Sequence, residues 1–461
     1  MGKKDKKQSE SKAIAKANKK QKSLKSADKK RNKKSPNDDD EVEEDLEEIL
    51  NKFQQELKNN LIVTEEVLPN GPSRRVNGTL TPDPSGNYLW LIGGDYFDGQ
   101  KLHTYNDVIR YDPSKPANEA WRIYKSKNAP APRSAHQVVS TSQGGGKLWL
   151  FGGEFAGHST FYHFGDFWCF DVTSKEWDKI DTKIKPSPRS GHRMTVFKHL
   201  IILFGGFHDT GVRTTYLDDL WVFDTLDFKW RKIEFSPIDR KPSPRSGFSF
   251  LTCQDQSEVI VHGGFCKTYE KGKRPVAKAL DDTYALKIDI ENNSFKWDRR
   301  KKVGYVPSLR SGSTMCYWGN KNMGVLFGGV TDDDKDEETL QSVFHNDLFG
   351  YNLSGGGKWI SLNLKKPKKA SSKKSKRKGK KKKQQRNQID SEEEDEKSNN
   401  EEEEEVNNYG SEDDNDQRND NNTNNENENE NENEDIDDPL KSTPLPRYNP
   451  MLAILRNTLY M

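Results

Sequence analysis

Short apolar runs that end in two glycines recur five times along the chain. Each run is followed by one of the pairs Gly93 and Gly94, Gly152 and Gly153, Gly205 and Gly206, Gly263 and Gly264, and Gly328 and Gly329. The first glycines of successive pairs are 59, 53, 58 and 65 residues apart. A period of this length indicates a repeat architecture built from one supersecondary unit.

Each repeat can be aligned outward from its glycines. An arginine lies 17 to 20 residues before the second glycine, and that interval predicts two short strands joined by a turn. After the glycines comes a loop of variable length, then an aspartate that opens a third strand, and 11 to 15 residues later a tryptophan that starts a fourth. The five tryptophans are Trp121, Trp177, Trp230, Trp297 and Trp359.

Four short strands with turns between them form one blade of a β-propeller. One such sheet cannot cover both of its faces, so neighbouring blades must do so. We expect the tryptophans to fill the space between adjacent sheets, and the glycines to end the second strand where the chain needs positive φ. The pattern therefore predicts an all-β propeller with five complete four-stranded blades.

A sixth repeat begins near Arg447 and stops early. Two strands are expected at 451–455 and 458–461, and the sequence ends about one residue before a further glycine pair is due. Two interpretations stay open. Either the sixth blade is truncated because the sequence is incomplete, or residues 61–67 supply an outer strand to that blade and reduce its exposed edge.

Charge is strongly segregated outside the repeats, although the formal net charge is only +2. Residues 1–35 hold fifteen Lys/Arg, residues 365–386 hold fourteen, and residues 390–438 hold twenty-four acids. Such segments cannot bury enough apolar surface to fold. We therefore expect a disordered basic tail at 1–40, an amphipathic helix at 41–58, blades one to five at 61–364, a disordered basic-then-acidic insertion at 365–440, and the first half of blade six at 441–461.

Targeting signals are limited. The lysine-rich N-terminus has no apolar core of the kind a secretory signal needs, and no apolar run approaches 18 residues. The four cysteines are scattered without a CxxC pair, which favours a reducing compartment. These features predict a cytoplasmic or nuclear location and no membrane contact.

The combined pattern of arginine, glycine pair, aspartate and tryptophan resembles the kelch repeat over residues 61–364. Segments 151–156 with 161–163, 189–194 with 203–208, and 45–53, together with the charged insertion, are most similar to the kelch domain-containing protein 4 group. The resemblance implies a six-bladed propeller of the intracellular, protein-binding kind. It implies no biochemical activity.

The topology places the repeat arginines and the loops after the glycines on one face. We expect a protein partner there, with acidic or phosphorylated peptides favoured by bidentate guanidinium contacts. The expected partner-binding residues are Arg75, Arg133, Arg189, Arg245, Arg310, Arg447, Phe161, Tyr162, His163 and Tyr216. The alternative, left open here, is that each arginine pairs with the aspartate that opens the third strand of its own or a neighbouring blade.

Catalytic signatures are missing from the sequence. The densest histidine cluster, His158 and His163 with Asp166, lacks metal-ligand spacing, and no nucleotide or nucleophile motif is present. We therefore expect no enzyme activity, cofactor, metal or small-molecule substrate, and no BTB-like or F-box-like domain is visible.

Two other functions were weighed against the interaction scaffold. The main alternative is an RNA-associated or ribosome-biogenesis factor whose lysine runs at 1–36 and 365–386 contact phosphates. The other is a metal-dependent propeller enzyme. We also considered that the acidic stretch 390–438 folds back over the arginine ring and regulates it in cis.

Overall fold

The computed structural model describes residues 63–126, 128–157, 161–253, 257–269, 272–336, 339–363 and 444–461. The predicted tails and insertion (1–40 and 365–440) and the predicted helix (41–58) lie outside these residues. Within the described part, helix is confined to two 3-10 turns, η1 (Gln143–Gly145) and η2 (Gly319–Lys321).

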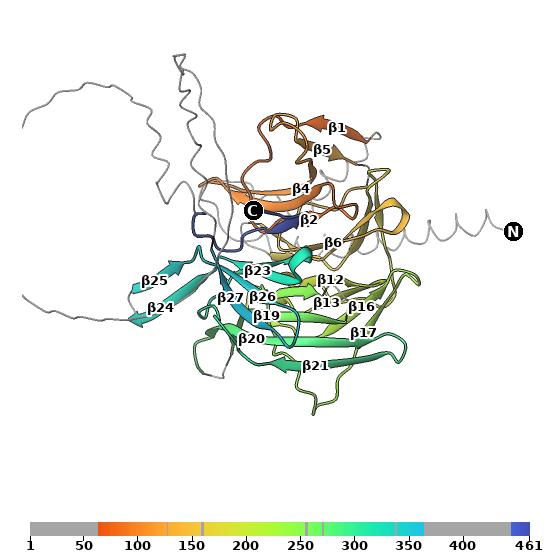
Figure 1. Cartoon of the computed structure of the whole chain (residues 1–461). Helices are drawn as coiled ribbons and strands as arrows, with labels where there is room; N and C mark the ends of the chain where they lie inside the picture. Colours follow the sequence, from red (N-terminus) through yellow and green to blue (C-terminus); the bar gives the residue numbers. More distant parts are fainter. Residues whose placement is uncertain are drawn as a thin grey trace, which may run out of the picture. The chain divides into compact units, whose positions relative to one another are not determined.

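Five antiparallel sheets form the blades of a propeller (Figure 1). They are β2 (Thr79–Pro82), β3 (Leu89–Phe97), β4 (Leu102–Tyr111) and β5 (Trp121–Lys125); β6 (Gln137–Thr141), β7 (Lys147–Phe151), β10 (Phe167–Asp171) and β11 (Trp177–Lys179); β12 (Arg193–Phe197), β13 (Leu200–Phe204), β16 (Leu220–Asp224) and β17 (Lys229–Ile233); β18 (Ser249–Thr252), β19 (Glu258–Thr268), β20 (Val276–Asp289) and β21 (Ser294–Arg300); and β22 (Thr314–Trp318), β23 (Met323–Phe327), β26 (Leu348–Asn352) and β27 (Lys358–Leu362). The five four-stranded repeats predicted from the sequence are thereby confirmed.

The first blade has one additional strand. β1 (Thr64–Val67) pairs antiparallel with β5, with Thr64 opposite Lys125 and Val67 opposite Arg122. The suggestion that residues 61–67 supply an outer strand to the sixth blade is therefore wrong, because this segment covers the outer edge of the first blade.

The core lies between neighbouring sheets, where the repeat tryptophans pack against the preceding blade. Trp230 of the third blade packs with Trp149 and Phe167 of the second, and Trp359 of the fifth packs with Ile260 of the fourth. A buried aromatic side chain removes roughly 150–250 Å² from water, which at about 25 cal/mol per Å² is several kcal/mol. Trp177, Trp230 and Trp359 are buried, whereas Trp121 and Trp297 are only partly buried.

The glycine pairs follow the second strand in three blades, as expected, whereas in the first and fourth blades β3 and β19 continue through the pair with a shift in register. Both glycines have positive φ in all five copies. A Cβ on Gly206, at φ +96°, would lie 2.8 Å from both the Ser190 carbonyl oxygen and the His192 Cβ. The pair is therefore required by backbone conformation and by close approach of the neighbouring chain.

The C-terminal residues form a two-stranded sheet of β28 (Ala453–Leu455) and β29 (Thr458–Tyr460). β28 contacts β22 of the fifth blade and β2 of the first, while β2, β6, β12, β18 and β22 contact one another in that order. The innermost strands thus form a closed ring around a central channel. The truncated sixth blade expected from the sequence stays a prediction.

Candidate functional site

Four of the repeat arginines clamp the base of a loop in their own blade. Arg133 donates from Nη1 to the Gly152 carbonyl oxygen (3.0 Å) and holds both Asp166 oxygens, at 2.7 and 3.0 Å. Arg189 holds Gly205 and Asp219 in the same way, Arg245 holds Gly263 and Asp282, and Arg310 holds Gly328 and Asp347. In the first blade Arg75 donates to the Gly93 carbonyl oxygen at 3.3 Å but to one oxygen of Asp107, at 3.1 Å. One guanidinium therefore joins the end of the second strand to the start of the third.

Burial accompanies this pairing. Arg133, Arg189 and Arg245 are at most 1% exposed, and Arg310 is 5% exposed. Burial acts to raise the pKa of Asp219, but the hydrogen bond and charge of Arg189 outweigh it, and the pKa lies below its ordinary value. Such bidentate, desolvated ion pairs are strong and fixed in geometry.

These contacts favour the structural alternative for the arginines: each pairs with the aspartate of its own blade. A guanidinium whose donors are already bound to a carboxylate and a carbonyl is not free to take a partner's acid. The direct partner-binding role proposed for Arg75, Arg133, Arg189, Arg245 and Arg310 is thus not supported by this geometry. Arg447, by contrast, is exposed, and no ion pair of its side chain appears among the described residues.

The loop clamped in each blade is a β-hairpin, a feature that the sequence analysis did not predict. The hairpins comprise residues 94–105, 154–163, 207–216, 264–280 and 330–344, and we call them the hairpin crown. Three of them are separate two-stranded sheets: β8 (Glu154–Ala156) with β9 (Phe161–His163), β14 (Phe207–Asp209) with β15 (Thr214–Tyr216), and β24 (Val330–Asp336) with β25 (Thr339–Phe344). The other two are extensions of the strand pairs β3–β4 and β19–β20. The turn signals Asp98-Gly99 and Gly211 were available in the sequence.

The predicted aromatic residues lie on two of these hairpins. Phe161, Tyr162 and His163 are on β9 and Tyr216 is on β15; Tyr162 is exposed, Tyr216 is partly buried and His163 is buried. The side chain of Phe161 lies outside the described part of the structure. The crown carries seven exposed large apolar side chains: Phe97, Tyr162, Val212, Tyr269, Val276, Val343 and Phe344.

His163 connects two neighbouring hairpins. Its Nε2 accepts a hydrogen bond from the Asp209 backbone N–H at 2.9 Å, so the ring proton lies on Nδ1, which donates to Ser190 Oγ at 2.8 Å. Burial, followed by the nearby His208, lowers the pKa of His163 to about 4. A neutral His163 therefore has a positioning role and no free nitrogen for a ligand.

A further contact links the third and fourth hairpins. The Thr214 backbone N–H donates to the Tyr269 hydroxyl at 3.3 Å, and the Arg213 guanidinium lies 5.4 Å from the Tyr269 ring centroid. Three adjacent hairpins are thus held as one surface, which reduces the conformational entropy that binding would cost.

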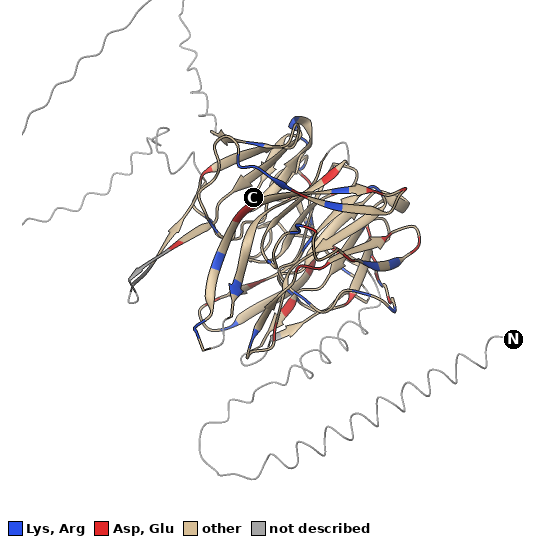
Figure 2. Ribbon diagram, turned by 90° about the horizontal axis from the view of Figure 1, so that it is seen from below, with Lys and Arg blue, Asp and Glu red and all other residues tan. Residues whose placement is uncertain are grey.

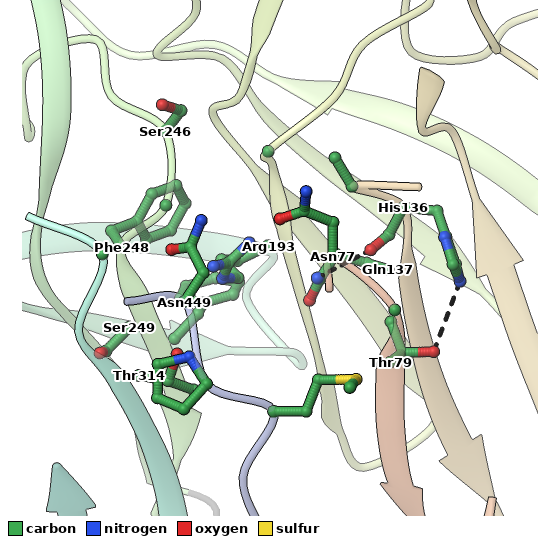
Figure 3. A pocket seen from close by; sticks show the side chains of 18 of the residues that line it. Asn77, Thr79, His136, Gln137, Arg193, Ser246, Phe248, Ser249, Thr314 and Asn449 are labelled. Atoms are coloured by element: carbon green, nitrogen blue, oxygen red, sulfur yellow. Dashed lines mark hydrogen bonds between the residues drawn. The ribbon is translucent and has the colours of Figure 1, made fainter. Parts of the chain in front are cut away.

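The channel beneath the crown contains a cavity of about 480 Å³ (Figure 3). Two of its lining residues are ionisable side chains of opposite charge, Arg193 and Glu154. Burial raises the pKa of Glu154 to about 7, against the lowering effect of its hydrogen bond with Ser190; the charges of Asp95 and Asp209 raise it further.

Metal-binding clusters are not found in the part of the chain that the structure describes, where no three His, Cys, Asp or Glu side chains converge. Residue 158 lies outside that part. None of the helices among the described residues is long and apolar enough to cross a membrane.

Comparison with known proteins agrees with this architecture. A family model described as the KLHDC2/KLHL20/DRC7 Kelch-repeats domain matches residues 79–289. An F-box/kelch-repeat protein of Arabidopsis thaliana is 30% identical over 239 residues, which cover 50% of this chain and 45% of that protein. Human kelch domain-containing protein 3 is 26% identical over 194 residues, covering 41% and 47%.

Human host cell factor 1 is 29% identical over 175 residues, which cover 37% of this chain and 8% of that protein. The chain thus spans less than half the length of each of these relatives. Taken with the five four-stranded blades, the family model and the kelch-containing relatives support the kelch-repeat family for this β-propeller.

Proposed function

We propose that the chain is a protein-interaction module that binds a protein partner on its hairpin crown. The observation that carries this proposal is the row of exposed apolar side chains on five hairpins. At the base of each hairpin a repeat arginine donates a hydrogen bond to the carbonyl oxygen of the first glycine of the pair. Exposed apolar and aromatic groups on a rigid scaffold are typical of interaction surfaces. Kelch propellers are generally interaction domains, in keeping with this proposal.

A matched pair of substitutions tests the crown. Val212, 94% exposed, lies between β14 and β15 on the crown, whereas Leu226, 67% exposed, lies in the β16–β17 turn at the other end of the same blade. We expect Val212→Asp to lose protein partners that Leu226→Asp retains, because only the former places a charge in the apolar contact area.

The measurement is quantitative mass spectrometry of proteins captured from cells with the wild-type chain and the two variants. Phe97→Asp, on a different hairpin, provides an independent second variant. Recovery of the same proteins at the same levels with all three variants would contradict the proposed surface.

The finer proposals concern the partner and the compartment. An acidic or phosphorylated partner is favoured by the exposed Arg213 and Arg447 rather than by the clamped arginines. The charge pattern of the sequence favours a cytoplasmic or nuclear location, and membership of the kelch domain-containing protein 4 group rests on the segments named above.

RNA association remains a second candidate because of the lysine runs at 1–36 and 365–386. On the described propeller, basic and acidic positions are interspersed (Figure 2), so this candidate depends on those runs. If RNA association is the function, crosslinking to RNA in cells should be lost when both lysine runs are deleted and kept in Val212→Asp. Loss of protein partners in Val212→Asp alone would instead support protein binding on the hairpin crown.

A further inference from the structure

Arg193 lines the central cavity and, within the described part of the chain, forms no ion pair with a carboxylate. Arg193 begins β12, the innermost strand of the third blade, and its side chain reaches the central cavity (Figure 3). Its described hydrogen bond runs from Nη1 to the His192 carbonyl oxygen, at 3.2 Å. Among the described residues no ion pair joins Arg193 to an acid.

Its environment differs from that of the clamp arginines. Burial lowers the pKa of Arg193 to about 10, while the nearby Tyr448 acts in the opposite direction. The acidic side chain of the lining, Glu154, forms its contacts with Ser190 and His163 instead. Arg193 is partly buried, and a guanidinium that loses part of its water without gaining a counter-charge is stabilised by a bound anion.

The neighbouring groups suit an anion with several oxygen atoms. Asn77, Gln137 and Asn449 bring side-chain amides to the same cavity, and Ser249 and Thr314 bring hydroxyls. These groups can donate hydrogen bonds without adding negative charge. Asn77 Nδ2 already donates to Asp95 at 3.4 Å and Gln137 Nε2 to the His136 carbonyl oxygen at 3.0 Å, which leaves one N–H of each amide for a ligand. Together with Arg193 these side chains line a cavity of about 480 Å³, within the usual size range of small-ligand sites, in which Glu154 is the acidic side chain.

We propose that the channel binds an oxyanion, a carboxylate or phosphate group, through Arg193 with help from the amides of Asn77, Gln137 and Asn449. The group comes either from a small free anion or from an acidic side chain that a partner inserts. The site goes beyond the proposed protein-binding role and does not depend on the crown, since none of these residues belongs to the five hairpins.

Titration of the full-length chain with three probes in low-chloride buffer tests the site. The probes are inorganic phosphate, citrate, and hexaglutamate with an acetylated N-terminus and an amidated C-terminus. Binding is measured by calorimetry and by the ligand-dependent rise of the thermal unfolding midpoint. We expect at least one probe to bind the wild type, and Arg193→Gln to weaken it by about 10- to 100-fold, as for loss of a charged hydrogen-bonding partner.

Arg299→Gln is the matched control, since it removes one exposed arginine from the outermost strand of the fourth blade. It should bind like the wild type. Arg193→Lys keeps the positive charge but lacks the planar guanidinium that contacts two oxygens at once, so it should weaken binding several-fold. This variant replaces Arg193→Gln in the test if the glutamine variant does not fold.

The outcomes separate clearly. Arg193-dependent binding of phosphate or citrate supports a free anion, and Arg193-dependent binding of hexaglutamate alone supports an inserted side chain. The proposal is overturned if no probe binds, or if the Arg193 variants bind within twofold of the wild type. Val212→Asp tests the hairpin crown alone, so a loss of its protein partners would neither support nor overturn anion binding by Arg193.

Discussion

Three arginines of the propeller differ in the groups that face their guanidinium. Arg189 faces Asp219 and a glycine carbonyl, Arg193 faces an open polar chamber, and Arg447 is exposed. The spacing to the glycine pair marks the clamp arginines in the sequence but does not reveal their partners. Arg193, four residues after Arg189, could not be singled out from the sequence because nothing in the pattern shows which side chains face the channel.

The clamp predicts a response to both mutation and acid. Asp219→Asn leaves the fully buried Arg189 without a counter-charge and should lower the free energy of unfolding at pH 7 by about 3–5 kcal/mol. The pKa of Asp219 is lower in the folded protein than in the unfolded chain, where an aspartate has a pKa of about 3.9. The Asp219 carboxylate therefore contributes its full stabilisation above about pH 3.9, and this contribution is lost as the pH falls through the pKa of the folded state.

Urea unfolding at several pH values measures this effect. The stability difference between the wild type and Asp219→Asn should be largest near neutral pH and shrink below about pH 4. Asp181→Asn, at an exposed position, is the control and should change little. A difference that stays constant from pH 7 to pH 3 would rule out the ion pair as its source.

At the scale of elements, the strands of the blades were predictable and the crown was not. The turn at Lys198, for example, joins β12 and β13, the two short strands expected between Arg189 and its glycine pair. The hairpins of the second and third blades could not be predicted because their strands have three residues, too few to show an alternation of apolar and polar positions. Their formation depends on the clamp and on neighbouring hairpins, which is tertiary information.

The glycine pair should be indispensable for starting a hairpin. Gly206 and Gly211 both have positive φ, but a Cβ on Gly206 meets backbone and side-chain atoms at 2.8 Å, whereas one on Gly211 meets nothing within 4 Å. Gly211→Ala should therefore cost about 1–2 kcal/mol, from backbone strain alone. Gly206→Ala should cost clearly more, because the crowding is added.

Thermal unfolding followed by circular dichroism compares the two alanine variants directly. Equal shifts of the unfolding midpoint would mean that the third blade relaxes around Gly206 and that close approach is not what requires the glycine.

At the scale of the whole molecule, the ring of innermost strands depends on a short segment. β28 lies between β2 and β22, and Leu455 and Ala453 pack with Leu89 of the first blade. Expectations from the sequence included two strands here, since Arg447 repeats the register of the other arginines. They did not include the contact with the first blade, because no local pattern encodes it.

Breaking this contact should destabilise the whole propeller. Leu455→Asp places a carboxylate at a site that is 3% exposed and should lower the free energy of unfolding by at least about 3 kcal/mol. Leu445→Asp, at a site that is 57% exposed, is the control. A wild-type unfolding midpoint for Leu455→Asp would show that the five blades are stable without the C-terminal sheet.

The position of β28 in the chain also determines when, during translation, the ring of innermost strands can close. The fifth blade is complete at Leu362, but the strand that joins it to the first blade does not begin until Ala453. At 5–20 residues per second, a ribosome needs roughly 5–20 s to reach that strand. During that interval the inner edges of the first and fifth blades stay exposed on the nascent chain, as natural binding sites for a chaperone.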